Sequence, residues 1–149
     1  MEIKTIIFDL SEVLIAGILG VERPLAATLG ISEQQVLSAF CNPSLERLFR
    51  GELFEEECLA SLIEQNGWPV SVEFTKGILR ANFQLVMPGM PQLVRQLSSQ
   101  YELVLLSDRA REWITYIESI HPFLRYFEYR FYSYHFQRTK KFRDLSTLF

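Results

Sequence analysis

Two polar residues follow a short apolar run near the start of the chain. Residues 5–8 read Thr-Ile-Ile-Phe, and Asp9 and Ser11 come soon after them. A β-branched and aromatic run without polar alternation predicts a strand that is buried on both faces. In open α/β sheets, ligands and chemistry collect at the carboxyl ends of the strands. Asp9 is therefore a candidate nucleophile or metal ligand, and Ser11 is its hydroxyl neighbour.

Other polar residues follow two later runs of the same kind. Ser107 and Asp108 come after the apolar run 101–106, and a strand-like run at 127–132 leads towards Lys140. A carboxylate that attacks an anionic phosphate needs its negative charge neutralised, which a lysine and a divalent cation can do. The Ser107 hydroxyl and the backbone N–H groups of a following helix could hold phosphate oxygens.

The stretch between the first strand and residue 86 has helical spacing throughout. Ser32 and Gln35 form a capping-box pair, and Gly30 and Gly67 stand where helices end. The apolar stripes of these helices predict mutual packing in a small bundle. The predicted helices span residues 24–30, 33–40, 43–51, 55–65 and 74–85.

A Pro-Gly-Met-Pro sequence at 88–91 ends the helical stretch. Beyond it we predict a helix at 92–99, a strand at 101–106, a helix at 110–120 and a strand at 127–132. This order predicts an α/β fold, a Rossmann-like parallel sheet with right-handed crossovers and an inserted helical bundle. The expected division is a core of residues 1–16 and 87–149 and a helical cap of residues 17–86.

The composition favours a soluble globular protein. The chain has 149 residues, a formal net charge of −3 and a pI near 5.5, which argues against a nucleic-acid surface. No apolar run approaches the roughly 18 residues of a membrane span, and the N-terminus has no signal-peptide pattern. We expect a cytoplasmic protein with no membrane partner. Cys41 and Cys58 are interpreted as small buried hydrophobic residues in a reducing compartment.

The ordered set of motifs resembles the haloacid dehalogenase (HAD) superfamily. The resemblance rests on Phe-Asp-Leu-Ser-Glu-Val-Leu at 8–14, Pro-Gly-Met-Pro-Gln-Leu at 88–93 and Leu-Leu-Ser-Asp at 105–108, and more loosely on residues 133–141. It covers essentially the whole chain. The helical insert looks like the small four-helix cap of that superfamily, and Gly-Glu-Leu at 51–53 resembles its cap sequences.

The resemblance implies a role for each matching residue. Asp9 would attack the substrate and form an acyl-phosphate intermediate. The Asp9 side chain and the backbone carbonyl of Ser11 would bind Mg²⁺. Ser107 would hydrogen-bond the transferring phosphoryl group, and Lys140, or its neighbour Lys141, would bridge Asp9 and the phosphate.

Ser11 and Asp108 depart from the family pattern. Phosphatases of the superfamily usually have a second aspartate at Ser11, which protonates the leaving group; loss of such help costs roughly 10²–10⁴ in rate. Dehalogenases also lack it, because halide leaves without protonation. Asp108 stands where a neutral residue is usual. Pointing into the site, it would contact the substrate and repel phosphate by about 4 kcal/mol at 4 Å; its other interpretation is a cap for the helix at 110–120.

The C-terminal region departs furthest. Lys140 is not followed by proline, and no strand with paired acids follows it. A Mg²⁺ held by one carboxylate and one carbonyl would bind weakly or be absent, and the sheet would expose a strand edge. Truncation, a shifted reading frame and a homo-oligomer that covers the edge all remain open explanations.

Two hypotheses of different kinds remain. The first is a HAD-like hydrolase in which Asp9 attacks a small phosphorylated or halogenated metabolite. The second is a catalytically inactive relative that binds a phosphorylated ligand or a protein. A receiver-like phosphoacceptor domain shares a strand-end aspartate and a lysine, but the long helical insert argues against it. Insert residues that could select the substrate are Arg47, Arg50 and Asn82.

Overall fold

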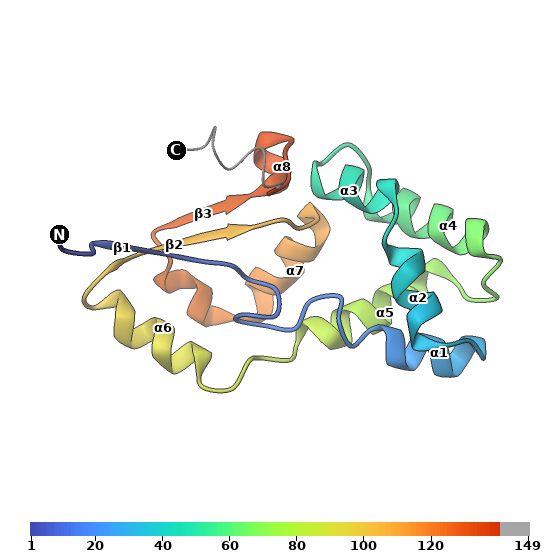
Figure 1. Ribbon diagram of the computed structural model, residues 1–149, viewed down its shortest axis with the longest axis horizontal. Coiled ribbons are helices and arrows are strands. Elements are labelled where there is room, and N and C mark those ends of the chain that lie inside the picture. The colour runs from blue at the N-terminus through green and yellow to red at the C-terminus, as the bar shows by residue number, and fades with distance from the viewer. Residues whose placement is uncertain (141–149) are drawn as a thin grey trace.

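A three-stranded parallel sheet organises the protein, whose computed structural model describes residues 1–140. The strands β1 (Thr5–Phe8), β2 (Glu102–Ser107) and β3 (Tyr129–Tyr132) lie in the order β1-β2-β3 (Figure 1). In the register, Phe8 pairs with Leu105, and Ser107 pairs with Tyr132. The carboxyl ends of all three strands therefore meet at one end of the sheet. The predicted parallel α/β fold is confirmed.

Five helices fill the stretch between β1 and β2 that was predicted to be helical, and a sixth follows them. Side chains of Ser32, Asn42 and Ser71 cap α2, α3 and α5, and left-handed glycines end α1 and α4. The bounds are α1 Glu22–Leu29, α2 Glu33–Phe40, α3 Pro43–Phe49, α4 Glu55–Asn66, α5 Val72–Phe83 and α6 Met90–Ser98. The remaining helices are α7 Arg111–Ile120, the 3-10 helix η1 Pro122–Tyr126 and the unpredicted α8 Ser133–Phe136.

The helices α6, α7 and η1 lie against one face of the sheet (Figure 1). Leu103 and Leu105 point to this covered face and are fully buried. The opposite face carries Ile7, which is 48% exposed, and Phe131, which is 38% exposed. The prediction that β1 is buried on both faces is therefore wrong, because no helix of the described residues covers its second face. A largely apolar hollow of about 380 Å³ lies there.

The helices α1 to α5 form a helical insert, residues 22–83, beside the carboxyl ends of the strands (Figure 1). The two chain segments that join it to the sheet layer run side by side. Ile15 and Val86 form an antiparallel bridge, and the Ala16 N–H donates to the Leu85 carbonyl at 2.8 Å. The insert therefore leaves and rejoins the sheet layer at one place.

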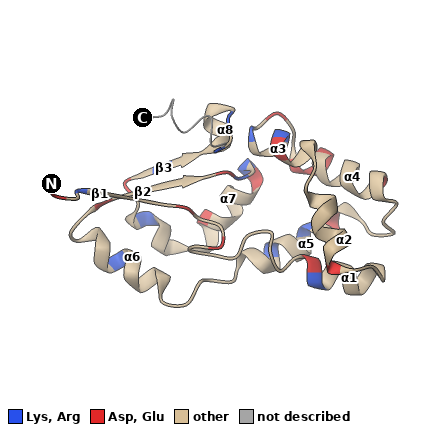
Figure 2. Ribbon diagram, in the orientation of Figure 1, with Lys and Arg blue, Asp and Glu red and all other residues tan. Residues whose placement is uncertain are grey.

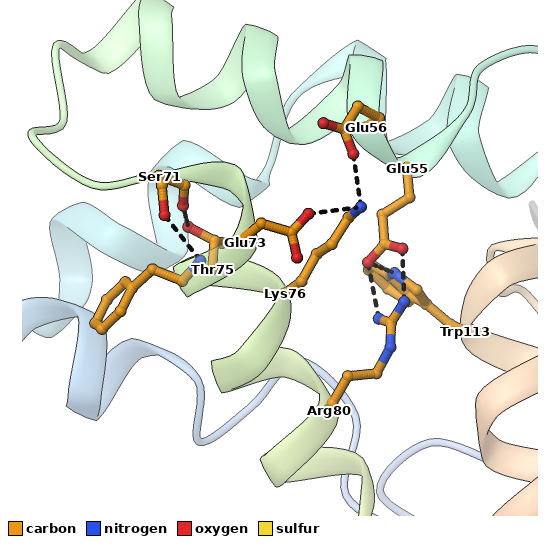
Figure 3. A network of polar contacts seen from close by, with 9 residues as sticks. Glu55, Glu56, Ser71, Glu73, Thr75, Lys76, Arg80 and Trp113 are labelled. Atoms are coloured by element: carbon orange, nitrogen blue, oxygen red, sulfur yellow. Dashed lines mark hydrogen bonds and ion pairs between the residues drawn. The ribbon is translucent and has the colours of Figure 1, made fainter.

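A buried carboxylate joins the insert to the sheet layer (Figure 3). Glu55 of α4 is 3% exposed and accepts two hydrogen bonds from the Arg80 guanidinium, at 2.7 and 2.6 Å. Its Oε1 also accepts from the Trp113 indole N–H of α7 at 2.9 Å. Both oxygens of this buried carboxylate thus accept hydrogen bonds from neighbouring side chains.

The two cysteines differ in exposure. Cys58 is buried and Cys41 is exposed, so the interpretation of Cys41 as a buried residue is wrong. Cys41 follows the last residue of α2, where the chain turns towards α3. Within residues 1–140, no helix is long and apolar enough to cross a membrane.

Candidate functional site

Asp9 and Lys140 meet at the carboxyl end of β1, although they are 131 positions apart in the chain. The Lys140 ammonium lies 2.9 Å from Asp9 Oδ2, and the Leu10 N–H donates to Oδ1 at 2.7 Å. Lys140 also donates to the Leu106 carbonyl at 3.1 Å, which ties it to the end of β2. The Asp9 side chain is 45% exposed and so open to solvent. This contact brings together two of the predicted site residues; Lys141 lies outside the described residues.

Ser107 is the last residue of β2, directly after the carbonyl that Lys140 contacts. It is 1% exposed, and its hydroxyl has no hydrogen-bond partner in the described structure. Buried hydroxyls in folded proteins nearly always have a partner. The Ser107 hydroxyl is thus a buried donor at the strand end that no described residue uses.

Asp108 has a different partner from the one expected. Its carboxylate accepts the Lys140 backbone N–H, at 3.0 Å through Oδ1 and 2.8 Å through Oδ2. The N-cap of α7 is Ala110, with no side-chain cap, so the interpretation of Asp108 as a helix cap is wrong. Burial raises the pKa of Asp108, and the hydrogen bond from Lys140 opposes that rise. Asp108 thus fixes the segment that presents the lysine.

A cavity of about 770 Å³ opens between the insert and the strand ends. Its walls are mainly apolar and include Phe40, Leu45 and Phe49 of the insert, while Asp108 and Thr139 border it from the other side. The three insert residues predicted to select a substrate are engaged elsewhere. Arg47 and Arg50 pair with Glu52, and Asn82 donates to the carbonyls of Gly17 and Leu19.

The loop after Asp9 has an unusual backbone. Glu12 adopts a left-handed conformation with φ of 61°, which is uncommon for a residue with a side chain. Its Oε1 accepts the Gly17 N–H at 2.6 Å, and its own N–H donates to the Ile15 carbonyl at 2.8 Å. Ser11, one residue earlier, is half-buried. The side chain of Glu12 therefore holds the loop that follows Asp9 in a strained shape.

Arg109, which comes directly after Asp108, was not singled out in the sequence. It is 2% exposed, and its Nε and Nη2 have no hydrogen-bond partner. Burial lowers its pKa to about 10, while the charges of Glu12 and Asp9 act in the opposite direction. The guanidinium is thus still charged at neutral pH. Its position two residues after Ser107 is the sequence signal that could have indicated it, since alternate residues of an extended segment point to the same side.

Charged positions of both signs follow the ends of β1 and β2 (Figure 2). The oxygen ligands needed for Mg²⁺ are few here. Asp9 and the carbonyl of Ser11 are suitable oxygen donors, but residues 1–140 contain no cluster of three or more acidic, histidine or cysteine side chains around a common point. A magnesium ion at Asp9 would therefore take most of its ligands from substrate and water.

Solved structures share this architecture. A HAD family enzyme from Bacteroides thetaiotaomicron, in complex with magnesium and inorganic phosphate, matches 99% of this chain and 77% of its own, at 19% identity and a TM-score of 0.75. The chain has the HAD-like fold. A predicted HAD-like family hydrolase from Porphyromonas gingivalis matches 99% of this chain and 75% of its own, at 18% identity and a TM-score of 0.71.

A dehalogenase shares the HAD-like fold as well. L-2-haloacid dehalogenase from Xanthobacter autotrophicus matches 99% of this chain and 63% of its own, at 17% identity and a TM-score of 0.66. No protein-family model matches the sequence, and no curated protein matches it significantly. The likeness is therefore one of fold, and the chemistry has to be argued from the site.

Proposed function

We propose that the protein is a HAD-like hydrolase in which Asp9 is the nucleophile. The observation that carries this proposal is the 2.9 Å contact between Asp9 and Lys140 at the strand ends. A strand-end carboxylate that is half-exposed and paired with a lysine can approach an electrophile while its charge is partly neutralised. The helical insert, residues 22–83, would act as the cap that encloses the substrate in the neighbouring cavity.

Two substrate classes suit this site. With a phosphate monoester, an Asp9 oxygen attacks phosphorus, the bond to the leaving-group oxygen breaks, and water cleaves the acyl phosphate to free Asp9. With a 2-haloacid, the oxygen attacks the carbon that bears the halogen, halide departs, and water cleaves the ester. Ser11 cannot serve as a general acid at neutral pH, which favours leaving groups that need no proton. Halide and aryl oxide are such groups.

Magnesium would be held by the Asp9 carboxylate and the Ser11 carbonyl, and would neutralise charge on a bound phosphoryl group. Lys140 would remain the nearest protein cation to Asp9. Ser107 would donate its hydroxyl to an oxygen of the substrate. Asp108 would keep Lys140 in place through the backbone N–H and border the substrate cavity.

Turnover assays with the Asp9→Asn variant test this proposal. The wild-type protein is offered an aryl phosphate with Mg²⁺ and, separately, a short 2-haloacid. We expect turnover of at least one substrate, and a loss of roughly 10³-fold or more in Asp9→Asn. Glu33→Gln on the exposed start of α2 removes the same charge far from the site and should leave the rate unchanged. Equal activity of Asp9→Asn and wild type would refute the nucleophile.

A second candidate function is binding without catalysis. It is favoured by the Ser11 hydroxyl at the position of a general acid, and by the scarcity of metal ligands among residues 1–140. In that case the wild-type protein binds inorganic phosphate in a calorimetric titration and consumes neither substrate. Turnover that depends on Asp9 rules this candidate out.

A further inference from the structure

Arg109 is a buried cation without a counter-charge in contact. It is 2% exposed, its Nε and Nη2 have no partner, and no carboxylate of residues 1–140 forms an ion pair with it. Buried charges in proteins are normally paired and hydrogen-bonded, because removing them from water is expensive. An exception of this kind calls for a physical explanation.

Aromatic neighbours explain only part of the arrangement. The guanidinium carbon lies 5.1 Å from the ring centre of Phe83 and 5.7 Å from that of Trp113. Such contacts satisfy the flat face of a guanidinium. Its N–H donors lie in the plane of the group and need acceptors at its edge. The aromatic residues therefore hold the plane in a fixed orientation and leave the donors of Nε and Nη2 free.

The free edge lies against the loop that carries Asp9. A side-chain carbon placed on Gly17 would lie 2.8 Å from Arg109 Nη2 and 3.0 Å from the Cβ of Ser11. The Gly17 backbone therefore packs so closely on Arg109 and on the Asp9 loop that no side chain fits at this position. The charges of Asp9 and Glu12 both act on the guanidinium, so the group lies within electrostatic range of the nucleophile. Ser107, another buried residue with an unpartnered polar atom, is two positions away in the chain.

The charges around Asp9 also favour a role for Arg109 in binding an anion. Asp9, Glu12 and Asp108 carry three negative charges, and Lys140 supplies one positive charge, in contact with Asp9. An anionic substrate would meet a net negative site if these four groups were the whole of it. Arg109 supplies a second positive charge, and it lies next to Asp108 in the chain.

We propose that Arg109 binds an oxyanion of the substrate, either a phosphoryl or a carboxylate group, and so selects substrates that carry one. This proposal rests on the proposed function and names a determinant of its substrate class. The oxyanion accepts the in-plane N–H donors of Arg109 together with the Ser107 hydroxyl, both of which lack a partner in the described structure.

Binding titrations of the full-length protein test the proposal. Inorganic phosphate and a short 2-haloacid are titrated calorimetrically, at constant ionic strength, into wild type, Arg109→Met, Arg109→Lys and Arg111→Met. Arg111 is an exposed residue that stacks on Tyr134 and serves as the matched control. We expect Arg109→Met to weaken binding of one or both probes roughly 10-fold or more, because hydrogen bonds to a charged group are lost. Arg109→Lys should recover part of the loss, and Arg111→Met should stay within roughly 2-fold of wild type.

The two probes identify the oxyanion. Weakened phosphate binding alone assigns a phosphoryl group, and weakened haloacid binding alone assigns a carboxylate. Wild-type affinity for both probes in Arg109→Met, or no binding of either probe to wild type, overturns the proposal. If Arg109→Met does not fold, the Nε–H resonance of Arg109 in the wild-type protein decides instead. It should shift on addition of a probe, and an unmoved resonance at saturation also overturns the proposal.

The outcomes separate this inference from the proposed function. Turnover that depends on Asp9 while Arg109→Met binds normally would leave the hydrolase intact and remove Arg109 from its site. Loss of binding in Arg109→Met while neither substrate is consumed would leave an oxyanion site in a protein without hydrolase activity.

Discussion

Glu55 and Arg109 are both buried charges, yet their surroundings are opposite. Glu55 accepts three hydrogen bonds, two from Arg80 and one from Trp113 (Figure 3). Arg109 lies as deep and leaves Nε and Nη2 without a partner. A fully satisfied buried charge stabilises the arrangement of the elements that supply its partners. A charge left unsatisfied at a strand end lowers stability and can be retained for a ligand.

Removal of Glu55 should have the largest effect on stability. Glu55→Ala leaves the Arg80 guanidinium and the Trp113 N–H without their acceptor, and we expect a loss of about 3 kcal/mol in the free energy of unfolding. Glu56→Ala is the matched control, because Glu56 is 64% exposed and its pair with Lys76 should contribute at most about 1 kcal/mol. Urea titrations measure both. Equal losses would show that burial does not distinguish the two pairs.

Gly17→Ala should come next. The added carbon would lie 2.5 Å from Glu12 Oε1 and 2.8 Å from Arg109 Nη2, closer than van der Waals contact allows. We expect a destabilisation of about 1–3 kcal/mol, together with weaker phosphate binding, because both charged groups must move. Gly77→Ala on α5 has open space around the added carbon and serves as the control. Unchanged stability and binding in Gly17→Ala would mean that the loop relaxes freely.

Arg109→Met should have a smaller effect of opposite sign. In the absence of ligand, the substitution removes an unpaired buried charge and keeps an apolar side chain of similar length. We expect the free energy of unfolding to rise by about 1 kcal/mol. Thermal or urea unfolding without phosphate measures the change. A loss of stability as large as that of Glu55→Ala would show that Arg109 stabilises the fold as Glu55 does, and that the two buried charges do not differ.

Asp108→Asn should have the smallest effect, and one that depends on pH. Burial raises the pKa of Asp108 in the folded protein, so folding favours its protonated form. The ionised group therefore lowers stability once the pH is above the folded-state pKa, and this penalty disappears below the unfolded value near 3.9. Relative to wild type, Asp108→Asn should be more stable at neutral pH, and this gain should vanish below about pH 4. A gain that stays constant with pH would contradict the titration of Asp108.

Local patterns predicted much of the fold. The bounds of β1 and α2 agree with the prediction, because a β-branched run and a capping box are signals contained within a few residues. The parallel order of the strands followed from the helical connections between them. The strand ends and the family resemblance together indicated Asp9 and Lys140, which the structure brings into contact.

The features that were missed depend on contacts between distant segments. The exposure of Ile7 depends on which helices cover the sheet, and the hydrogen bond from Lys140 to Asp108 spans 32 positions. Arg109 looks like a surface residue in the sequence, since arginine is seldom fully buried. Its burial depends on Phe83 and Trp113, which come from α5 and α7. The helix α8 is a single turn and gives no periodic signal.

The contact between Glu55 and Trp113 also means that tryptophan fluorescence can follow a movement of the helical insert. Glu55 and Arg80 both belong to the helical insert, so they would move together if the insert swung away from the sheet, and only the indole would lose its partner. The chain has one other tryptophan, Trp68, which packs against Phe40 within the insert. In a Trp68→Phe background, the emission wavelength of Trp113 would therefore report the opening of the insert directly, without an attached dye.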